Sequence, residues 1–150
     1  MKAVIQRVSS ASVTIDGCVY SSIQQGLMVL LGVEHSDSDE DLGWLVPKVL
    51  NMRIFNDVQG VMNLSLLEVS GDLLVVSQFT LMARTKKGNR PSYMDAAPPE
   101  FAIPMYEKFV AMAEIELKKS VKTGVFGADM KVELLNDGPV TIVIDTKNKQ

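Results

Sequence analysis

The sequence predicts an α+β fold, in which a mixed, strongly curved, barrel-like β-sheet carries two outer helices. Three observations lead to this class. Several short apolar runs are bounded by turn residues, which is typical of strands. Only two segments carry apolar residues at helical spacing. Strands that pair as hairpins at both ends of the chain argue against a doubly wound parallel sheet, and 150 residues fit a single domain, 1–150.

The first part of the chain predicts three consecutive strands. Asp16-Gly17 is a hairpin turn of the primed type between the first two, and residues 25–26 turn the chain again. We expect an irregularity at residues 9–10, where two serines interrupt the first apolar run. The predicted strands are 4–15, 18–23 and 27–33.

The two predicted helices follow from the spacing of their apolar residues. The acidic, polar stretch 36–41 supplies N-cap residues for the first helix. Pro47 lies inside its pattern and predicts a kink or a late helix start. The apolar positions are Leu42, Leu45, Val46, Val49 and Leu50 in the first helix, and Phe101, Met105, Phe109, Met112 or Ala113, and Leu117 in the second.

The remaining strands border two unusual segments. An apolar strand over 73–79 precedes a long polar loop over 84–98. Two further strands, 130–135 and 140–144, flank the hexapeptide Asn136-Asp137-Gly138-Pro139-Val140-Thr141. The predicted order is therefore β-β-β-α-β-α-β-β.

Composition limits where the protein works and what it binds. No run of about 18 apolar residues occurs, so no membrane partner is expected. The single cysteine, Cys18, excludes an internal disulfide and fits the reducing cytoplasm, and we expect it to be a small packed residue. A net charge of −3 excludes a general nucleic-acid coat, although one local basic patch is compatible with binding a defined RNA end.

Conventional catalytic sets are mostly missing from the sequence. His35 is the only histidine, and we expect it at the surface rather than in the role of a base. One histidine and one cysteine cannot form a zinc site of the usual spacing, so we expect neither a metal nor another cofactor. The chain also has no Gly-rich phosphate loop and no nucleophile elbow.

One strand end does carry polar side chains suited to a site. The apolar strand runs directly into Ser77-Gln78-Phe79-Thr80-Leu81. The backbone N–H groups around Phe79 and Thr80 are candidates for binding a carbonyl or oxyanion. Thr80 adds a hydroxyl, but no adjacent base would activate it. The alternative is an ordinary strand end with a threonine that caps the next turn.

The polar loop contains the one dense basic patch of the chain. Lys86, Lys87 and Arg90 are candidates for contacts with RNA phosphates. The alternative is a solvated run of charge with no ligand.

Gly138-Pro139 is the second candidate element. Proline removes a ladder donor and restricts the residue before it, and a Gly-Pro step permits a cis bond at little cost. A rigid Gly-Pro between two strands would fix two backbone carbonyls in one direction, which is a recognition device made of main chain.

These segments together resemble the D-aminoacyl-tRNA deacylase family over essentially the whole chain. Ser77-Gln78-Phe79-Thr80-Leu81 matches its first signature, and Asn136 to Thr141 matches its second, Asn-x-Gly-Pro-x-Thr. The resemblance implies a homodimer in which Gly138-Pro139 is cis and enters the partner's active site. There its carbonyls would reject an L side chain and admit D-aminoacyl or glycyl groups. In the family, Arg7 holds this element and Met130 lies near it.

The reaction implied by the resemblance is hydrolysis of the ester between a D-amino acid and the 3′ end of tRNA. Ser77, Gln78, Phe79 and Thr80 would line the ester pocket, and the 2′-hydroxyl of the terminal adenosine would assist attack by water. Pro47 and Arg84 depart from the family pattern, which puts loop shape and tRNA preference in question. Three alternatives stay open: Thr80 as a covalent nucleophile in a small-ester hydrolase, a non-catalytic module that binds an RNA end, and a structural dimer without a ligand.

Overall fold

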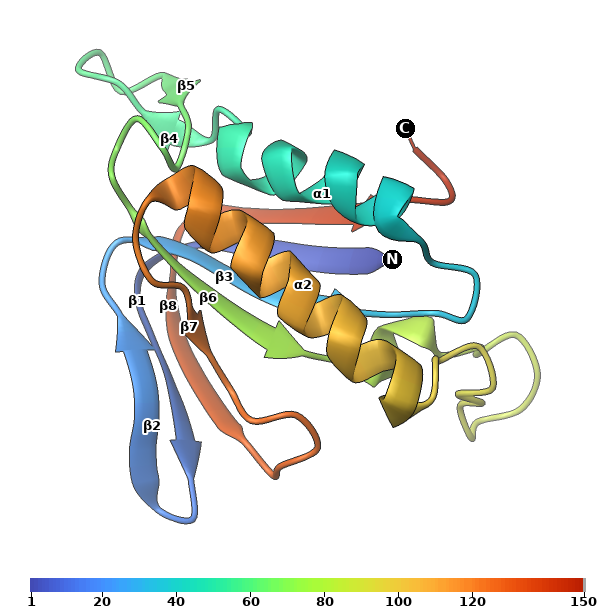
Figure 1. Cartoon of the computed structure of the whole chain (residues 1–150). Coiled ribbons are helices and arrows are strands. Elements are labelled where there is room, and N and C mark those ends of the chain that lie inside the picture. The colour runs from blue at the N-terminus through green and yellow to red at the C-terminus, as the bar shows by residue number, and fades with distance from the viewer. Residues whose placement is uncertain (150) are drawn as a thin grey trace.

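In the computed structural model, which describes residues 1–149, a mixed sheet curves strongly and two helices lie together against it (Figure 1). Its strand order is β2-β1-β3-β6-β7, with β8 also paired to β1, and β4 and β5 form a separate two-stranded sheet. The predicted mixed, barrel-like sheet with two helices is confirmed. The strands are β1 (Lys2–Ile15), β2 (Cys18–Ile23), β3 (Gly26–Gly32), β4 (Phe55–Asn56), β5 (Met62–Leu64), β6 (Asp72–Ser77), β7 (Lys122–Thr123) and β8 (Lys131–Asp145).

The long strand β1 organises the sheet. Its residues 2–8 pair with β3 and its residues 11–15 pair with β2, so both neighbours share one edge of the strand. The opposite edge pairs with β8. The register with β8 shifts twice between Gln6 and Ser10, which confirms the irregularity expected around residues 9–10. The bend in this region carries β1 from one strand neighbour to the next.

The C-terminal hairpin predicted from the sequence is wrong. Residues on both sides of Gly138-Pro139 belong to one strand, β8, and pair with β1 instead of with each other. Gln6 lies opposite Thr141 and Val8 lies opposite Asn136, so residue 7 alone faces 137–140. The Gly-Pro segment is therefore a large bulge in a continuous strand, with residues 137–140 opposite residue 7. The bulge places these residues beside Arg7 of β1.

Strands β3 and β6 are buried on both faces, which explains their uninterrupted apolar sequences. Val29 and Val75 face the main core beneath the helices. Met28, Leu74 and Val76 face a second core that β1, β2 and β8 help to enclose. Burial on two sides is what a curved, nearly closed sheet provides for its central strands.

The helices are α1 (Asp39–Asn51) and α2 (Pro99–Leu117), and the apolar positions of the first helix pattern are buried. Helix α1 begins at Asp39, where the Asp41 carboxylate accepts the Ser38 N–H at 2.8 Å. Of the kink or late start that Pro47 predicts, the late start is wrong, because this cap and three acidic residues in the first turn fix the start well before the proline.

Some short elements and one side chain differ from expectation. The strands β4, β5 and β7 were not predicted, because runs of two or three residues give no periodic signal. The strand expected over 73–79 ends at Ser77, and Phe79–Met82 forms a 3₁₀ helix. Cys18 is exposed rather than packed, since β2 begins with three exposed residues. Within residues 1–149, neither helix combines the length and apolarity needed to cross a membrane.

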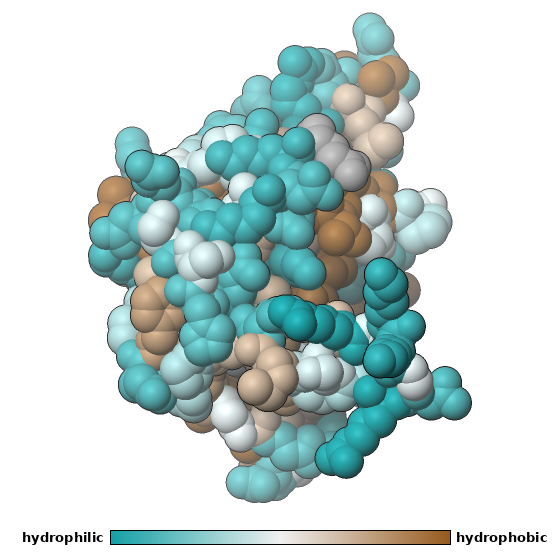
Figure 2. Space-filling view, turned by 90° about the vertical axis from the view of Figure 1, so that its right-hand side faces the viewer, coloured by the Kyte–Doolittle hydropathy of each residue, from teal (hydrophilic) through white to brown (hydrophobic). Residues whose placement is uncertain are grey.

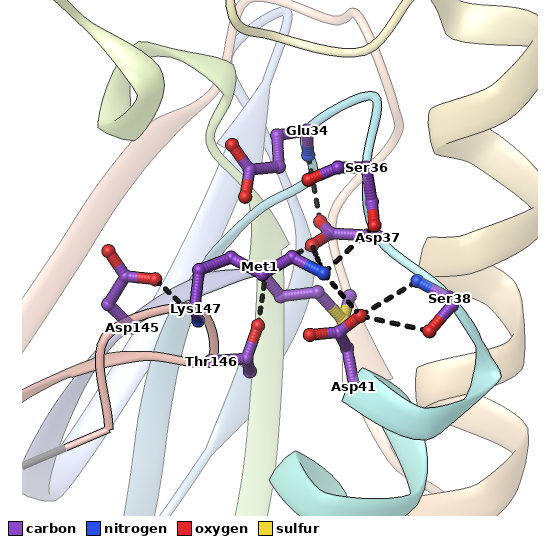
Figure 3. Close-up of polar contacts among 9 residues, drawn as sticks. All are labelled: Met1, Glu34, Ser36, Asp37, Ser38, Asp41, Asp145, Thr146 and Lys147. Carbon is purple, nitrogen blue, oxygen red and sulfur yellow. Dashed lines mark hydrogen bonds and ion pairs between the residues drawn. The ribbon is translucent and has the colours of Figure 1, made fainter.

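A buried polar cluster ties the start of β1 to the end of β8 (Figure 3). The amino group of Met1 pairs with the buried carboxylate of Asp37 and donates to Thr146 Oγ1 at 2.6 Å. Lys147 Nζ lies 2.8 Å from Asp41 Oδ2. Burial alone would raise the pKa of Asp41, but hydrogen bonds from Lys147, Thr146 and Ser38 outweigh it and lower that pKa. These contacts fix the strand pair on which the Gly-Pro bulge lies.

Candidate active site

A cavity of about 320 Å³ opens at the carboxyl ends of the parallel strands. Strands β3 and β6 run parallel with Leu31 opposite Ser77, and β7 runs parallel to β6. The segments that follow these strands meet at one edge of the sheet, and α2 covers them. The lining comes from Leu31 and Val33 at the end of β3 and just after it, residues 76–79 at the end of β6 and just after it, Ala97 before α2, Ala102 and Tyr106 of α2, residues 126–130 after β7, and Val132 of β8.

The segment after β6 forms the polar wall of this cavity. The backbone N–H of Gln78 donates to the Leu31 carbonyl at 2.8 Å, which holds the segment against β3. The Gln78 side-chain amide donates to Thr80 Oγ1 at 2.5 Å. Because Phe79 and Thr80 open the 3₁₀ helix, their backbone N–H groups have no acceptor within it. The structure thus offers amide and hydroxyl donors at the end of a rigid strand.

Ser77, Gln78 and Phe79 line the cavity as the sequence indicated, whereas Thr80 is not part of its lining. The Thr80 hydroxyl is tied to this wall by the hydrogen bond that it accepts from the Gln78 side chain. Among residues 1–149, no imidazole or carboxylate hydrogen-bonds to the Thr80 hydroxyl.

Two aromatic residues in the cavity were missed by the sequence analysis. Tyr106 of α2 donates its hydroxyl to the Val75 carbonyl at 2.7 Å, and burial raises the pKa of this tyrosine. Its ring meets Phe126 edge-on, with centroids 6.3 Å apart. Both lie far along the chain from the strand end they face, and a single aromatic residue in a helix or loop carries no motif.

Met130 lines the same cavity, next to a glycine that allows it to approach closely. A Cβ built on Gly124 would lie 2.3 Å from the sulfur of Met130. Only glycine at position 124 leaves room for this methionine. The thioether therefore closes one side of the pocket rather than pointing into solvent.

The Gly-Pro bulge is a second, separate constellation, and Arg7 anchors it. The Arg7 side chain is buried, and its Nε donates to the Asp137 carbonyl at 3.1 Å. Its Nη1 donates to the Ile54 carbonyl at 2.6 Å. A charged side chain is retained in such a place only when its donors are satisfied. The guanidinium thus joins β1, the segment before β4 and the bulge.

The backbone of the bulge requires glycine at position 138. Gly138 has φ = +123°, and its peptide bond to Pro139 is cis. A Cβ at this position would lie 2.8 Å from Arg7 Nη2 and 2.9 Å from Val140 Cγ2. Both Gly138 and Pro139 are exposed in the single chain.

Asn136 and Thr141 close the neck of the bulge. Asn136 Oδ1 accepts the Val140 N–H at 3.3 Å, and Asn136 Nδ2 donates to Thr141 Oγ1 at 3.2 Å. Gln6 Nε2 also donates to Thr141 Oγ1, at 3.4 Å. These contacts explain why Asn and Thr stand at the two ends of the hexapeptide.

The structure brings the predicted residues together in two groups and does not join the groups within one chain. Ser77, Gln78, Phe79 and Met130 share the cavity. Arg7, Asn136 and Thr141 surround Gly138-Pro139, and none of these lines the cavity.

The basic loop lies on the side of the molecule shown in Figure 2, where strongly hydrophilic side chains project. Arg84 is paired with Asp95 at the base of the loop, so its charge is internally compensated. Lys86, Lys87 and Arg90 are exposed and form no ion pair with any described residue. No three His, Cys, Asp or Glu side chains within residues 1–149 are grouped so that they could hold a metal ion.

The mixed, curved sheet with two helices thus carries a cavity at the ends of its parallel strands, and the polar wall of this cavity offers hydrogen-bond donors. The chain belongs to the D-Tyr-tRNA(Tyr) deacylase family, whose model matches residues 4–145. The predictions of this family and of this class of enzyme, a D-aminoacyl-tRNA deacylase, are confirmed.

Relatives match over the full length of the chain. D-aminoacyl-tRNA deacylases of Bacteroides fragilis and Flavobacterium psychrophilum are 65% and 61% identical, each covering 100% of both chains. A solved structure of a c-Myc DNA unwinding element binding protein is 41% identical, with a TM-score of 0.92 over 97% of this chain and 98% of that one. A probable eukaryotic D-amino acid tRNA deacylase is 18% identical with a TM-score of 0.83 over 95% and 97%, a likeness of fold alone.

Proposed function

We propose that residues 1–150 act as one cytoplasmic domain that hydrolyses the ester between a D-amino acid and the terminal ribose of tRNA. Glycyl esters are accepted as well, since they have no side chain to reject. The observation that carries the proposal is the cavity at the ends of β3, β6 and β7, which is walled by Ser77, Gln78 and Phe79. Its size and its apolar, aromatic lining suit a terminal aminoacyl-adenosine.

Catalysis in this site relies on orientation and on charge stabilisation. The N–H groups of Phe79 and Thr80 are proposed to hold the oxyanion as water attacks the ester carbonyl. The neighbouring 2′-hydroxyl of the terminal ribose assists that attack, so the protein needs no base of its own. Holding the ester against rigid backbone donors supplies much of the acceleration.

Selection against L-aminoacyl groups is assigned to Gly138-Pro139 of a second subunit. Three observations support this: the bulge is exposed, it lies outside its own chain's cavity, and Arg7 holds it rigidly. The outer edge of β8 has no strand partner within residues 1–149, so it is available for an isologous contact. A homodimer in which each bulge enters the other cavity follows, and sedimentation should give twice the mass of one chain.

The rival mechanism makes Thr80 a covalent nucleophile. Its hydroxyl accepts a hydrogen bond from the Gln78 amide, which is a donor and cannot remove the hydroxyl proton. Thr80→Ala should therefore retain measurable turnover of D-tyrosyl-tRNA. Loss of all turnover together with a trapped acyl adduct on the wild-type protein would establish the rival instead.

The function itself is tested by comparing D-tyrosyl-tRNA with a simple ester such as D-tyrosine methyl ester. Rapid hydrolysis of the RNA ester and negligible hydrolysis of the simple ester are expected, because the cavity binds the nucleoside. Equal activity on both would indicate a small-molecule esterase. Binding of tRNA with no hydrolysis above the buffer rate would indicate a non-catalytic module.

A further inference from the structure

Two exposed aromatic rings lie between the cavity and the basic loop. Phe79 lines the cavity and is 56% exposed, while Tyr93, which follows the basic loop, is 40% exposed. Their centroids are 5.2 Å apart and their planes meet at 71°. An edge-to-face pair leaves ring faces uncovered, and this pair leads outward from the cavity.

The position of Tyr93 is fixed by the base of the loop. Arg84 and Ser92 exchange two backbone hydrogen bonds, of 2.8 and 3.1 Å. The Arg84–Asp95 ion pair braces the same point with two hydrogen bonds, and the Tyr93 carbonyl accepts the Ala96 N–H at 3.0 Å. The Tyr93 ring is therefore held by a loop base that hydrogen bonds and an ion pair close.

The three uncompensated cations lie beyond this base. Lys86, Lys87 and Arg90 fall between the paired residues Arg84 and Ser92, so they occupy the outer part of the loop. An aromatic surface beside unpaired positive charge is the combination that binds single-stranded nucleic acid. Bases stack on the rings, and the cations hold the phosphates.

We infer that Tyr93, backed by Phe79, stacks on the penultimate base of the tRNA 3′ end when the terminal nucleoside fills the cavity. This inference rests on the proposed function and specifies how the single-stranded end is held. Tyr93 is a binding residue for the nucleotide next to the reacting one. It makes the enzyme prefer a longer RNA end over a bare aminoacyl-adenosine.

The test compares two substrates with each protein: D-tyrosyl-adenosine and the trinucleotide cytidine-cytidine-adenosine esterified with D-tyrosine. The wild type should favour the trinucleotide in kcat/KM by at least about tenfold, the gain that one stacked base supplies. Tyr93→Ala should lower this ratio by about tenfold and keep only the preference that the cations give through the phosphates, whereas Tyr93→Phe, which keeps the ring, should preserve the wild-type ratio. Met94→Ala is the matched control, because Met94 is 79% exposed and adjacent but has no ring. Its ratio should equal that of the wild type.

A change on the substrate side isolates the contact. A trinucleotide ester with an abasic penultimate position should lose the same factor with the wild type as Tyr93→Ala loses with the intact ester. The two changes together should lose no more than either alone, because both remove one interaction. Additive losses would overturn the stacking contact.

The remaining outcomes distinguish failure of the stacking inference from failure of the proposed deacylase function. If the wild type hydrolyses both esters and Tyr93→Ala keeps the wild-type ratio, the stacking inference is wrong and the proposed function stands. If the wild type hydrolyses neither ester nor D-tyrosyl-tRNA, the proposed function fails. If Tyr93→Ala shifts the sedimentation of the protein, the rings form a contact between proteins, and the inference is wrong.

Discussion

Replacing Gly138 by alanine tests whether a rigid bulge controls stereochemical selection. The new methyl would lie 2.8 Å from Arg7 Nη2 and 2.9 Å from Val140 Cγ2, on a residue with φ = +123°. A backbone conformation of this kind costs a residue with a side chain about 1–3 kcal/mol. Losing one charged hydrogen bond of Arg7 adds about 1.5–3 kcal/mol. We therefore expect Gly138→Ala to lower the free energy of unfolding by about 2.5–6 kcal/mol.

The effect on function follows from the displacement of Arg7 and of the bulge. The methyl meets its own chain rather than open space, so the carbonyls of the bulge must move. Rejection of L-aminoacyl groups should weaken, and the ratio of kcat/KM for D-tyrosyl-tRNA to that for L-tyrosyl-tRNA should fall. Urea unfolding measures the first effect, and hydrolysis of both labelled esters measures the second.

Gly60→Ala is the matched control. Gly60 also has a positive φ, +79°, but nothing lies within 4 Å of a Cβ built there. This variant should lose only the backbone term, about 1–2 kcal/mol, and keep its selectivity. If Gly138→Ala is as stable as Gly60→Ala and discriminates as well as the wild type, the assigned role of the bulge is refuted.

Three further predictions concern the anchoring and charged residues. Asn136→Ala should remove the link across the neck of the bulge, costing about 0.5–1.5 kcal/mol in urea unfolding and lowering selectivity less than Gly138→Ala does. Single Ala variants of Lys86, Lys87 or Arg90 should each reduce by about one the slope of log K for tRNA binding against log salt, whereas unchanged slopes would mean that these cations touch no phosphate. Because folding lowers the pKa of Asp41, its stabilising effect is present above the unfolded pKa of about 3.9 and is lost as the pH falls through the lower folded value. The wild type should thus lose stability below about pH 4 more steeply than Asp41→Asn, and parallel curves would contradict the assignment.

Local sequence was informative about the cavity wall and the helices. Ser77 ends a continuous apolar strand and Gln78 follows it directly, and polar side chains at such a point have few structural reasons to be there. The apolar spacing of α1 located that helix, although Pro47 misled the expectation of its start. In each case the signal lies within a few consecutive residues.

Non-local pairing accounts for what the sequence did not reveal. The residues around Gly138-Pro139 do not reveal that the strand residues on both sides of them pair with β1. A hairpin turn and a bulge in one strand therefore have the same local sequence pattern. Tyr106 and Phe126 enter the cavity only because α2 and the segment after β7 fold over β6. The Met1–Asp37–Thr146 cluster likewise joins residues from both ends of the chain and leaves no motif.

The most direct test of stereochemical selection is to incubate the wild-type protein separately with D-tyrosyl-tRNA and L-tyrosyl-tRNA and to follow release of the amino acid. Rapid release of D-tyrosine is expected, with L-tyrosine released at the rate seen in buffer alone. Comparable release of both enantiomers would contradict the assigned role of Gly138-Pro139, and release of neither would contradict the deacylase itself.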